Sequence, residues 1–465
     1  MSKKRRKGLS LNDRPVEQPT AAGVDIGARE IFVAVHHDPD GDPVRRFGTF
    51  TEDLNQMADW LERCGVTTVA MESTGVYWIP LYEILDRRGL KPCVVNARHM
   101  KNVPGRRTDW HECQWIQFLH SVGLLRAAFR PDDPVCAVRA ILRHRQQLVE
   151  MGAQHVQHMQ KSLTQMNLQI HHVISDITGT TGLAIVDAIL AGERDPATLA
   201  KLRDRRIKAS PETVEKSLLG NWREEHLFTL RQSLELYRFY QGQIVAADQK
   251  IESLLSEFTP RVDPEQKPLP ADAKKNRGTA KRRKKLGHST SFDLRTEAYK
   301  LFGVDVTQIP GFASNVIPLF SEVGRDLTRW PSAGQFVSWL ALCPDNDITG
   351  GRVQFRGMRT ANNRAGQIFR MAAHSLHHSQ TPMGGYFRRL KAKLDSAAAI
   401  TATARKIATI FYTLVSRQVE YDDSIWQASD TERLKRQQQK LALEFQFCPA
   451  RTHPKQHCRS FALCR

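Results

Sequence analysis

The sequence predicts an α/β layered domain at the N-terminus, then two long helices, then a mostly helical C-terminal part. Strand-like and helical segments alternate from about residue 23 to residue 123, which is typical of an α/β layer. Apolar residues then step by four and three through 138–173 and again through 227–258, the spacing of long helices that bury one stripe. The last apolar region, 296–422, has helical spacing for most of its length.

Each element of the α/β part has a local signal. Residues 24–35 indicate one strand or a tight pair, and the runs 45–51, 66–74 and 91–96 are strand-like. Helical spacing predicts helices over 51–65, 78–88 and 108–121. In the first of these, Thr51 is suited to begin the helix and Gly65 to end it.

The apolar stripe through 138–173 has two exceptions, Arg145 and Gly152. Such a stripe predicts an antiparallel coiled-coil arm or a helical dimer interface, and two long core helices would show it equally well. The predicted divisions are a disordered basic tail over 1–20, an α/β domain over 21–130, a coiled-coil or helical region over 131–258, a disordered basic linker over 259–295, a C-terminal domain over 296–422 and a basic tail over 423–465.

The charge of the chain favours a polyanionic partner. It has 68 Lys and Arg against 49 Asp and Glu, a formal net charge of +19. This balance favours DNA or RNA over an acidic small substrate, although a basic but otherwise ordinary enzyme is the alternative. No run of about 18 apolar residues is present, so no membrane partner is expected.

Cysteine usage and the N-terminus predict a cytoplasmic protein. The basic N-terminus lacks an apolar stretch, so it is not a secretory signal. The eight cysteines are scattered, which indicates free thiols in a reducing compartment. The tail could ligate zinc, but its spacing matches no standard finger; its candidate ligands are Cys448, His453, His457, Cys458 and Cys464.

Four acids are candidates for a metal site. Asp25 lies in the first strand, Glu72 ends a later one, and Asp109 and Glu112 lie one turn apart at the start of a helix. Carboxylates that converge repel each other unless they bind cations or share protons, and hard oxygen ligands suit Mg²⁺ or Mn²⁺. The alternative is that Asp109 and Glu112 only favour a helix N-terminus. An actin-like kinase would need further phosphate-binding glycine turns downstream, and the chain has none.

Two C-terminal segments are candidates for phosphate contacts. Gly311, after Pro310, is consistent with half of a helix-hairpin-helix or with a plain helix-joining turn. Thr349 precedes a glycine turn that would expose its hydroxyl, so it is either a nucleophile or a turn cap. The candidate phosphate-binding residues around it are Gly350, Gly351, Arg352, Arg356, Arg359 and Arg364.

These segments together resemble transposases of the insertion sequence 110 family. The resemblance rests on "GVDIG", "MESTGVYWIP", "RRTDWHECQWIQ", "IPGF" and the glycine turn followed by "NRAGQ", in order across about residues 21–420. It implies a RuvC-like, RNase H-type domain, a coiled coil and a C-terminal transposase domain with a serine nucleophile. It also implies recombination of DNA guided by a structured RNA, a covalent protein–DNA link, and a homodimer or homotetramer in the bacterial cytoplasm, near the nucleoid.

The resemblance carries over to individual residues with two departures. Asp25, Glu72 and Asp109 match the first three acids of the family, which implies that they are catalytic metal ligands. Glu112 stands where the family typically has aspartate, and Thr349 where it has serine. Two rival hypotheses follow from these departures: a junction-resolving nuclease that uses water as its nucleophile, and a catalytically inactive protein that binds RNA or DNA.

Overall fold

The computed structural model of the 465-residue chain describes residues 14–73, 75–96, 109–271, 290–350, 352–358, 363–423 and 439. The chain divides into two compact units, Met1–Arg130 and Pro131–Arg465. Most of the predicted C-terminal tail, with its zinc candidates, lies outside the described residues, as do residues 1–13 of the predicted N-terminal tail. Among the helices of the described part, none is long and apolar enough to cross a membrane.

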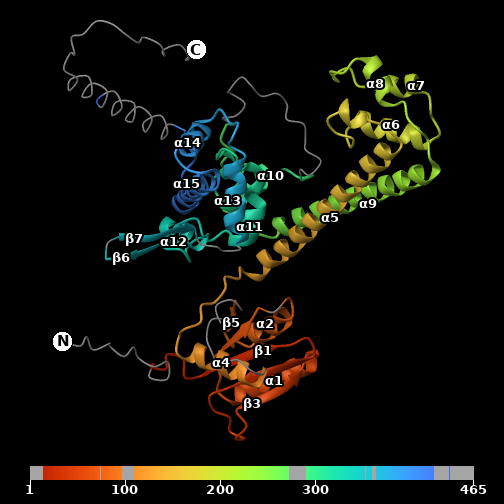
Figure 1. The fold of residues 1–465 in the computed structure, drawn as a ribbon. Helices are drawn as coiled ribbons and strands as arrows, with labels where there is room; N and C mark the ends of the chain where they lie inside the picture. The colour runs from red at the N-terminus through yellow and green to blue at the C-terminus, as the bar shows by residue number, and fades with distance from the viewer. Residues whose placement is uncertain are drawn as a thin grey trace, which may run out of the picture. The chain divides into compact units, whose positions relative to one another are not determined.

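The N-terminal unit is built on a five-stranded mixed sheet with the strand order β3-β2-β1-β4-β5 (Figure 1). Strands β1, β2 and β3 pair antiparallel, whereas β4 and β5 continue from β1 in parallel. The predicted segment 24–35 is therefore a tight pair and not one strand. The strands are β1 Ala21–Ile26, β2 Glu30–Ala34, β3 Val44–Gly48, β4 Thr68–Glu72 and β5 Pro92–Val95.

Helices cover both faces of this sheet, because alternate residues of β1 face opposite ways. Ala22, Val24 and Ile26 belong to the buried cluster that includes residues of α1 (Thr51–Arg63) and α2 (Trp78–Arg87). The other face receives α4 (Asp109–Ser121), whose Ile116 packs with Ala70 of β4. The three helices predicted for this part are thus present, close to the predicted bounds.

Helix α4 approaches β1 closely at Gly23. A Cβ atom at this position would collide with the backbone nitrogen of Gln117 and the carbonyl oxygen of Cys113. The Gln117 side chain also donates to the Ala21 carbonyl oxygen at 3.2 Å. Glycine at position 23 therefore sets how close the helix lies to the sheet.

The second unit contains the two long helices, α5 (Asp133–Gln165) and α9 (Glu224–Ser256). They run antiparallel (Figure 1), since Arg145 pairs with Asp248, His155 stacks on Tyr240 and Ser162 bonds to Thr229. The first helix ends at Gln165 and not near residue 173, because the chain turns at Asn167, whose φ is 57°. Coiled-coil packing of this pair stays a prediction.

One of the two exceptions in the apolar stripe, Arg145, has a structural reason. Arg145 and Asp248 are buried and form an ion pair, with the Arg145 Nε atom 2.5 Å from Asp248 Oδ1. The second carboxylate oxygen of Asp248 accepts from the Ser291 amide at 3.0 Å. A Cβ atom added at Gly152 would meet the Tyr240 side chain at ordinary contact distance, so the packing does not require glycine there. The ion pair aligns the two helices and connects them to the segment that enters α10.

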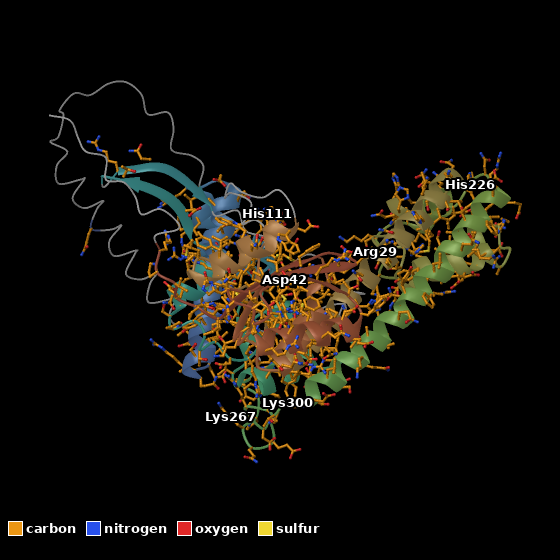
Figure 2. The ribbon with its side chains drawn as sticks, turned by 90° about the horizontal axis from the view of Figure 1, so that it is seen from below. Arg29, Asp42, His111, His226, Lys267 and Lys300 are labelled. Atoms are coloured by element: carbon orange, nitrogen blue, oxygen red, sulfur yellow. The ribbon has the colours of Figure 1, made fainter. Side chains whose placement is uncertain are left out.

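A small helical cap joins the far ends of α5 and α9. It consists of η2 Ile170–His172, α6 Thr180–Leu190, α7 Pro196–Lys201 and α8 Pro211–Ser217. Its own buried cluster includes Ile185, Leu199 and Val214 together with Leu227 and Leu230 of α9. His226, near the start of α9, lies at this end of the helix pair in Figure 2.

The C-terminal part is mostly helical, as predicted, around a cluster of phenylalanine rings. Rings of Phe302, Phe312, Phe336, Phe369 and Phe411 lie 5.3 to 6.3 Å apart, centroid to centroid, in contacting pairs. The elements are α10 Leu294–Phe302, η4 Val306–Gln308, η5 Ala313–Asn315, α11 Val316–Val323, α12 Ala333–Trp339, β6 Pro344–Thr349, β7 Arg352–Met358, α13 Arg364–His374, α14 Pro382–Lys391 and α15 Ser396–Arg417.

The described parts of the predicted disordered linker differ from that prediction. Residues 259–271 form turns that attach to α10, since the Arg261 amide donates to the Lys300 carbonyl oxygen at 2.8 Å. Arg295 also donates to the Pro270 carbonyl oxygen at 2.6 Å. Figure 2 shows Lys267 and Lys300 in the same region. The basic and proline-rich composition of this segment gave no indication of these backbone contacts. Residues 272–289 lie outside the described part of the chain.

We expect Gly23→Ala to destabilise the N-terminal unit by about 1–3 kcal/mol, because the added methyl pushes α4 away from β1. Thermal unfolding, with amide hydrogen exchange followed in α4, measures the effect. The control is Gly242→Ala in α9, where the new methyl meets open space and helix propensity should raise stability by about 0.5–1 kcal/mol. Equal effects of the two substitutions would contradict the close-approach argument.

We expect Asp248→Ala to cost about 3–5 kcal/mol in urea unfolding, because it removes the carboxylate that pairs with the buried Arg145 charge. The double variant Arg145→Met with Asp248→Leu should recover most of this loss, since it removes both buried charges. The exposed pair of Arg206 with Asp204 is the control, and Arg206→Ala should leave unfolding unchanged. A double variant no more stable than Asp248→Ala would show that the pair is not the cause.

Candidate functional site

The register of β1 and β4 brings Asp25 and Glu72 to neighbouring positions. Gly23 pairs with Ala70 and Val24 with Met71, so the next residues along the two parallel strands are Asp25 and Glu72. Alternation puts both on the face that carries α4, the same face as Gly23 and Ala70. Both side chains are half-buried. The two acids thus share one edge and one face of the sheet.

Helix α4 brings its first turn to the same corner. It runs opposite to β1, because Gln117 reaches Ala21 whereas Trp110 packs edge-on against Phe32, the partner of Asp25 in β2. The Phe32 and Trp110 ring centroids are 6.3 Å apart. Asp109 therefore begins the helix beside the end of β1, exposed, with Glu112 half-buried one turn later.

The acids of this corner affect the pKa of the Cys113 thiol. Burial raises the pKa of Cys113 to about 12, and the negative charges of Asp25 and Asp109 add to that rise. Two acids from different elements thus act on one buried group between the helix and the sheet. A thiol with so high a pKa stays neutral and is not a nucleophile at ordinary pH.

The carboxylates share a corner but are not gathered around one point. Within the described residues, no group of three or more His, Cys, Asp and Glu side chains is close enough to hold a cation. The donor chemistry itself fits a divalent ion, since all four candidates are oxygen ligands of the kind that Mg²⁺ or Mn²⁺ takes.

Thr349 lies in the second unit, at the end of a β-hairpin. It pairs with Arg352 across the turn, and both residues are exposed. Gly350 has a φ of 59°, which fits a two-residue hairpin turn. Figure 1 shows β6 and β7 extending away from the helices of this part. The hydroxyl is thus presented on a turn, as the sequence predicts.

The base of the hairpin is anchored in the helical part. Asn363 caps α13 and also donates to the Trp339 carbonyl oxygen at 2.9 Å. Arg370 donates to the Ala341 carbonyl oxygen at 2.8 Å, and burial lowers its pKa. These two bonds hold the end of α12 against α13. The segments that enter and leave the hairpin therefore lie side by side.

The other predicted phosphate contacts fall in several places. Arg364 is exposed at the first turn of α13. Gly311, with a φ of 79°, packs so closely on α13 that a Cβ would lie 2.6 Å from the Ala372 carbonyl oxygen. Gly351 and Arg359 lie outside the described residues, and of Arg356 only its backbone position in β7 is described.

Sequence reasoning missed two features that position these residues. The hairpin over 344–358 was not predicted, although "DITGGRVQF" has strand-like residues around a two-glycine turn. The role of Gly23 was also missed. A glycine two positions before the strand acid is a sign of close backbone approach, and it was available in "GVDIG".

Comparison with known families gives two matches, one in the N-terminal half of the chain and one in the C-terminal half. A transposase model for DEDD transposases of the IS110 type matches residues 22–168, which include all four acids. A model for the transposase IS116/IS110/IS902 family matches residues 305–388, which include the hairpin and α13. No match was found among the curated proteins. With the acid corner in one match and the Thr349 hairpin in the other, the chain belongs to the IS110 family of transposases, enzymes that act on DNA.

Proposed function

We propose that this transposase excises and inserts its own element by metal-dependent cleavage and exchange of DNA strands, guided by a structured RNA. The observation that carries the metal-dependent part is the register of β1 and β4 with α4 packed across them, which brings the elements of all four acids to one corner. The sheet order and the match to a DEDD transposase support a RuvC-like, RNase H-like fold for this unit.

The four acids hold the divalent ions in this proposal. Asp25 and Glu72 contribute from the strands, and Asp109 and Glu112 contribute from the first turn of α4. Bound there, Mg²⁺ or Mn²⁺ would neutralise charge on a phosphodiester and stabilise the attacking and leaving oxygens. The acids orient the ions through elements that the sheet already holds rigidly. Glu112 can reach the same ions as an aspartate, through one further methylene group.

Thr349 is the proposed nucleophile. Its Oγ1 forms a bond to phosphorus as the bond from phosphorus to one strand oxygen breaks; the proton lost by the hydroxyl is balanced by one gained on that oxygen. A phosphodiester replaces a phosphodiester, so a free strand hydroxyl can reverse the step and rejoin DNA without another energy source. The exposed Arg352 and Arg364 are proposed to hold the phosphate through charge-assisted hydrogen bonds.

The remaining assignments rest on turn and charge chemistry for the nucleic-acid contacts, and on the family resemblance for the guide RNA, the assembly and the location. Gly311, Gly350, Gly351, Arg356 and Arg359 are proposed as further contacts to nucleic acid. A structured guide RNA, and assembly as a homodimer or homotetramer, belong to the same proposal, as does the bacterial cytoplasm near the nucleoid as its place of action.

A nuclease that uses water is the second candidate. It is favoured by threonine at position 349, because the β-methyl crowds the hydroxyl and restricts its rotation. In that case Thr349 is structural and the acids alone support hydrolysis. A protein that binds nucleic acid without cleaving it is the third candidate, favoured by the combination of Glu112 and Thr349.

The covalent step predicts that labelled DNA stays on the denatured protein. With purified protein, the RNA that flanks the element, end-labelled DNA and Mg²⁺, we expect label on the wild type and none on Thr349→Val, which keeps the shape but has no hydroxyl. Thr349→Ser should retain the label. Asp25→Asn should lower cleavage about a thousandfold or more, because metal stabilisation is worth several kcal/mol.

The control for these variants is Glu52→Gln, an exposed acid on α1, across the sheet from α4. It should cleave like the wild type. Cleaved DNA without protein-bound label, unaffected by Thr349→Val, would favour the water-using nuclease. RNA binding without cleavage or label under any divalent ion would favour the inactive binding protein.

The metal site predicts a specific dependence on divalent ions. EDTA should stop cleavage, and Mg²⁺ or Mn²⁺ should restore it. Glu112→Ala should raise the Mg²⁺ concentration for half-maximal cleavage at least about tenfold, because it removes a candidate oxygen ligand. Titration of Mn²⁺ by calorimetry gives a readout that does not depend on cleavage. If Glu112→Ala and Glu52→Ala required the same Mg²⁺ concentration for half-maximal cleavage, Glu112 would not be a metal ligand.

A further inference from the structure

Five basic side chains gather where α13 passes into α14. His374 ends α13, His377 and His378 lie in the connecting turn, and Arg388 and Lys391 lie in the last turn of α14. The Lys391 Nζ atom is 2.8 Å from His377 Nε2, and His377 Nδ1 is 3.2 Å from His378 Nε2. We call this group the His377 cluster. Helices α13, α14 and α15 form one part of the fold (Figure 1).

The hydrogen bonds of the cluster determine which ring atoms carry protons. A lysine ammonium has only donors, so His377 Nε2 must accept from Lys391. His377 Nδ1 then carries the proton and donates to His378 Nε2. His377 is thus neutral, and it is held between a full positive charge and a second ring.

The positive charges around His377 disfavour protonation of its ring. The charge of Lys391 lowers the pKa of His377, followed by burial and then by His378, His374 and Arg388. Every charged or titratable group that acts on the ring is basic. In the described part of the chain, no carboxylate forms an ion pair with Arg388 or Lys391. A bound anion would offset the positive charge of Arg388 and Lys391.

The cluster is also built on a rigid turn. Thr381 caps α14 by accepting from the Gly384 amide at 3.2 Å, and Arg388 donates to the Ser379 carbonyl oxygen at 2.5 Å. The buried Phe387 lies under the assembly, with its ring centroid 6.0 Å from that of His377. The backbone of the turn is thus fixed by hydrogen bonds and by packing on a buried ring.

We propose that the His377 cluster binds a backbone phosphate of duplex DNA. A phosphate oxygen becomes the acceptor for Lys391 in place of His377. It also accepts from the free N–H groups of Arg388. DNA is the polyanion that a transposase must hold, and a contact of this kind sets the position of the duplex without reading its sequence. The site rests on DNA as the partner, and it does not depend on the RNA, the metal or Thr349.

Binding at this site is coupled to protonation. When a phosphate accepts from Lys391, His377 Nε2 is released, and the nearby negative charge raises the pKa of His377. Binding then takes up a proton, so the affinity for DNA should increase as the pH falls from 7.5 to 6. In the absence of DNA, the neighbouring positive charge of Lys391 lowers the pKa of His377.

The test measures binding of the full chain to a duplex of random sequence by fluorescence anisotropy, in EDTA. Lys391→Gln should weaken binding about fivefold and reduce the slope of log affinity against log salt by about 1. Lys250→Gln on α9 is the control, because it removes the same charge from an exposed lysine outside the cluster. Lys391→Arg should retain most of the affinity, since it keeps the charge and the donors.

His377→Gln tests the coupling. Its affinity should change less between pH 7.5 and pH 6 than that of the wild type, whereas Lys250→Gln should keep the wild-type difference. The proposal is overturned if Lys391→Gln binds DNA as Lys250→Gln does, or if the pH dependence of His377→Gln is unchanged. A loss confined to a single-stranded RNA probe would assign the cluster to RNA instead. Because EDTA prevents cleavage, these results are independent of the catalytic variants.

Discussion

The close approach of α4 to β1 at Gly23 is the constraint on which the N-terminal unit depends. Only a residue without a side chain lets the helix backbone lie against the strand, and this contact brings the first turn of α4 to the end of β1. The packing of Trp110 on Phe32 holds the same end from the neighbouring strand. Without this approach, Asp109 and Glu112 would have no fixed relation to Asp25 and Glu72.

The corner that results carries acidic side chains from three elements. Acids from two strands and one helix share an edge, and their charge reaches the buried Cys113 thiol. A fold tolerates such an arrangement when cations are available to it. The His377 cluster is the opposite case, basic groups held together on a rigid turn. Each collection of like charge is complementary to one part of the proposed reaction: a metal ion, or a DNA phosphate.

The second unit relies on a different kind of constraint, the alignment of long helices. The buried pair of Arg145 with Asp248 aligns α5 with α9, and through the Ser291 amide it reaches the segment before α10. The phenylalanine cluster then packs the C-terminal helices, and bonds to the Trp339 and Ala341 carbonyl oxygens close the base of the hairpin. Thr349 thus extends from a fixed base, on a turn that needs Gly350 for its positive φ.

The sequence by itself determined the element types and the chemistry of the candidate residues. Period and turn signals suffice for β1 to β5, α1, α2, α4 and the long helices, because these depend on local spacing. It did not reveal the hairpin, the contacts of residues 259–271 or the His377 cluster. In the sequence, Arg145 is an exception to the apolar stripe. Its partner of opposite charge, Asp248, lies 103 positions away in the chain. Strand register and backbone approach join residues far apart in the chain, so only the tertiary structure decided which acids share a corner.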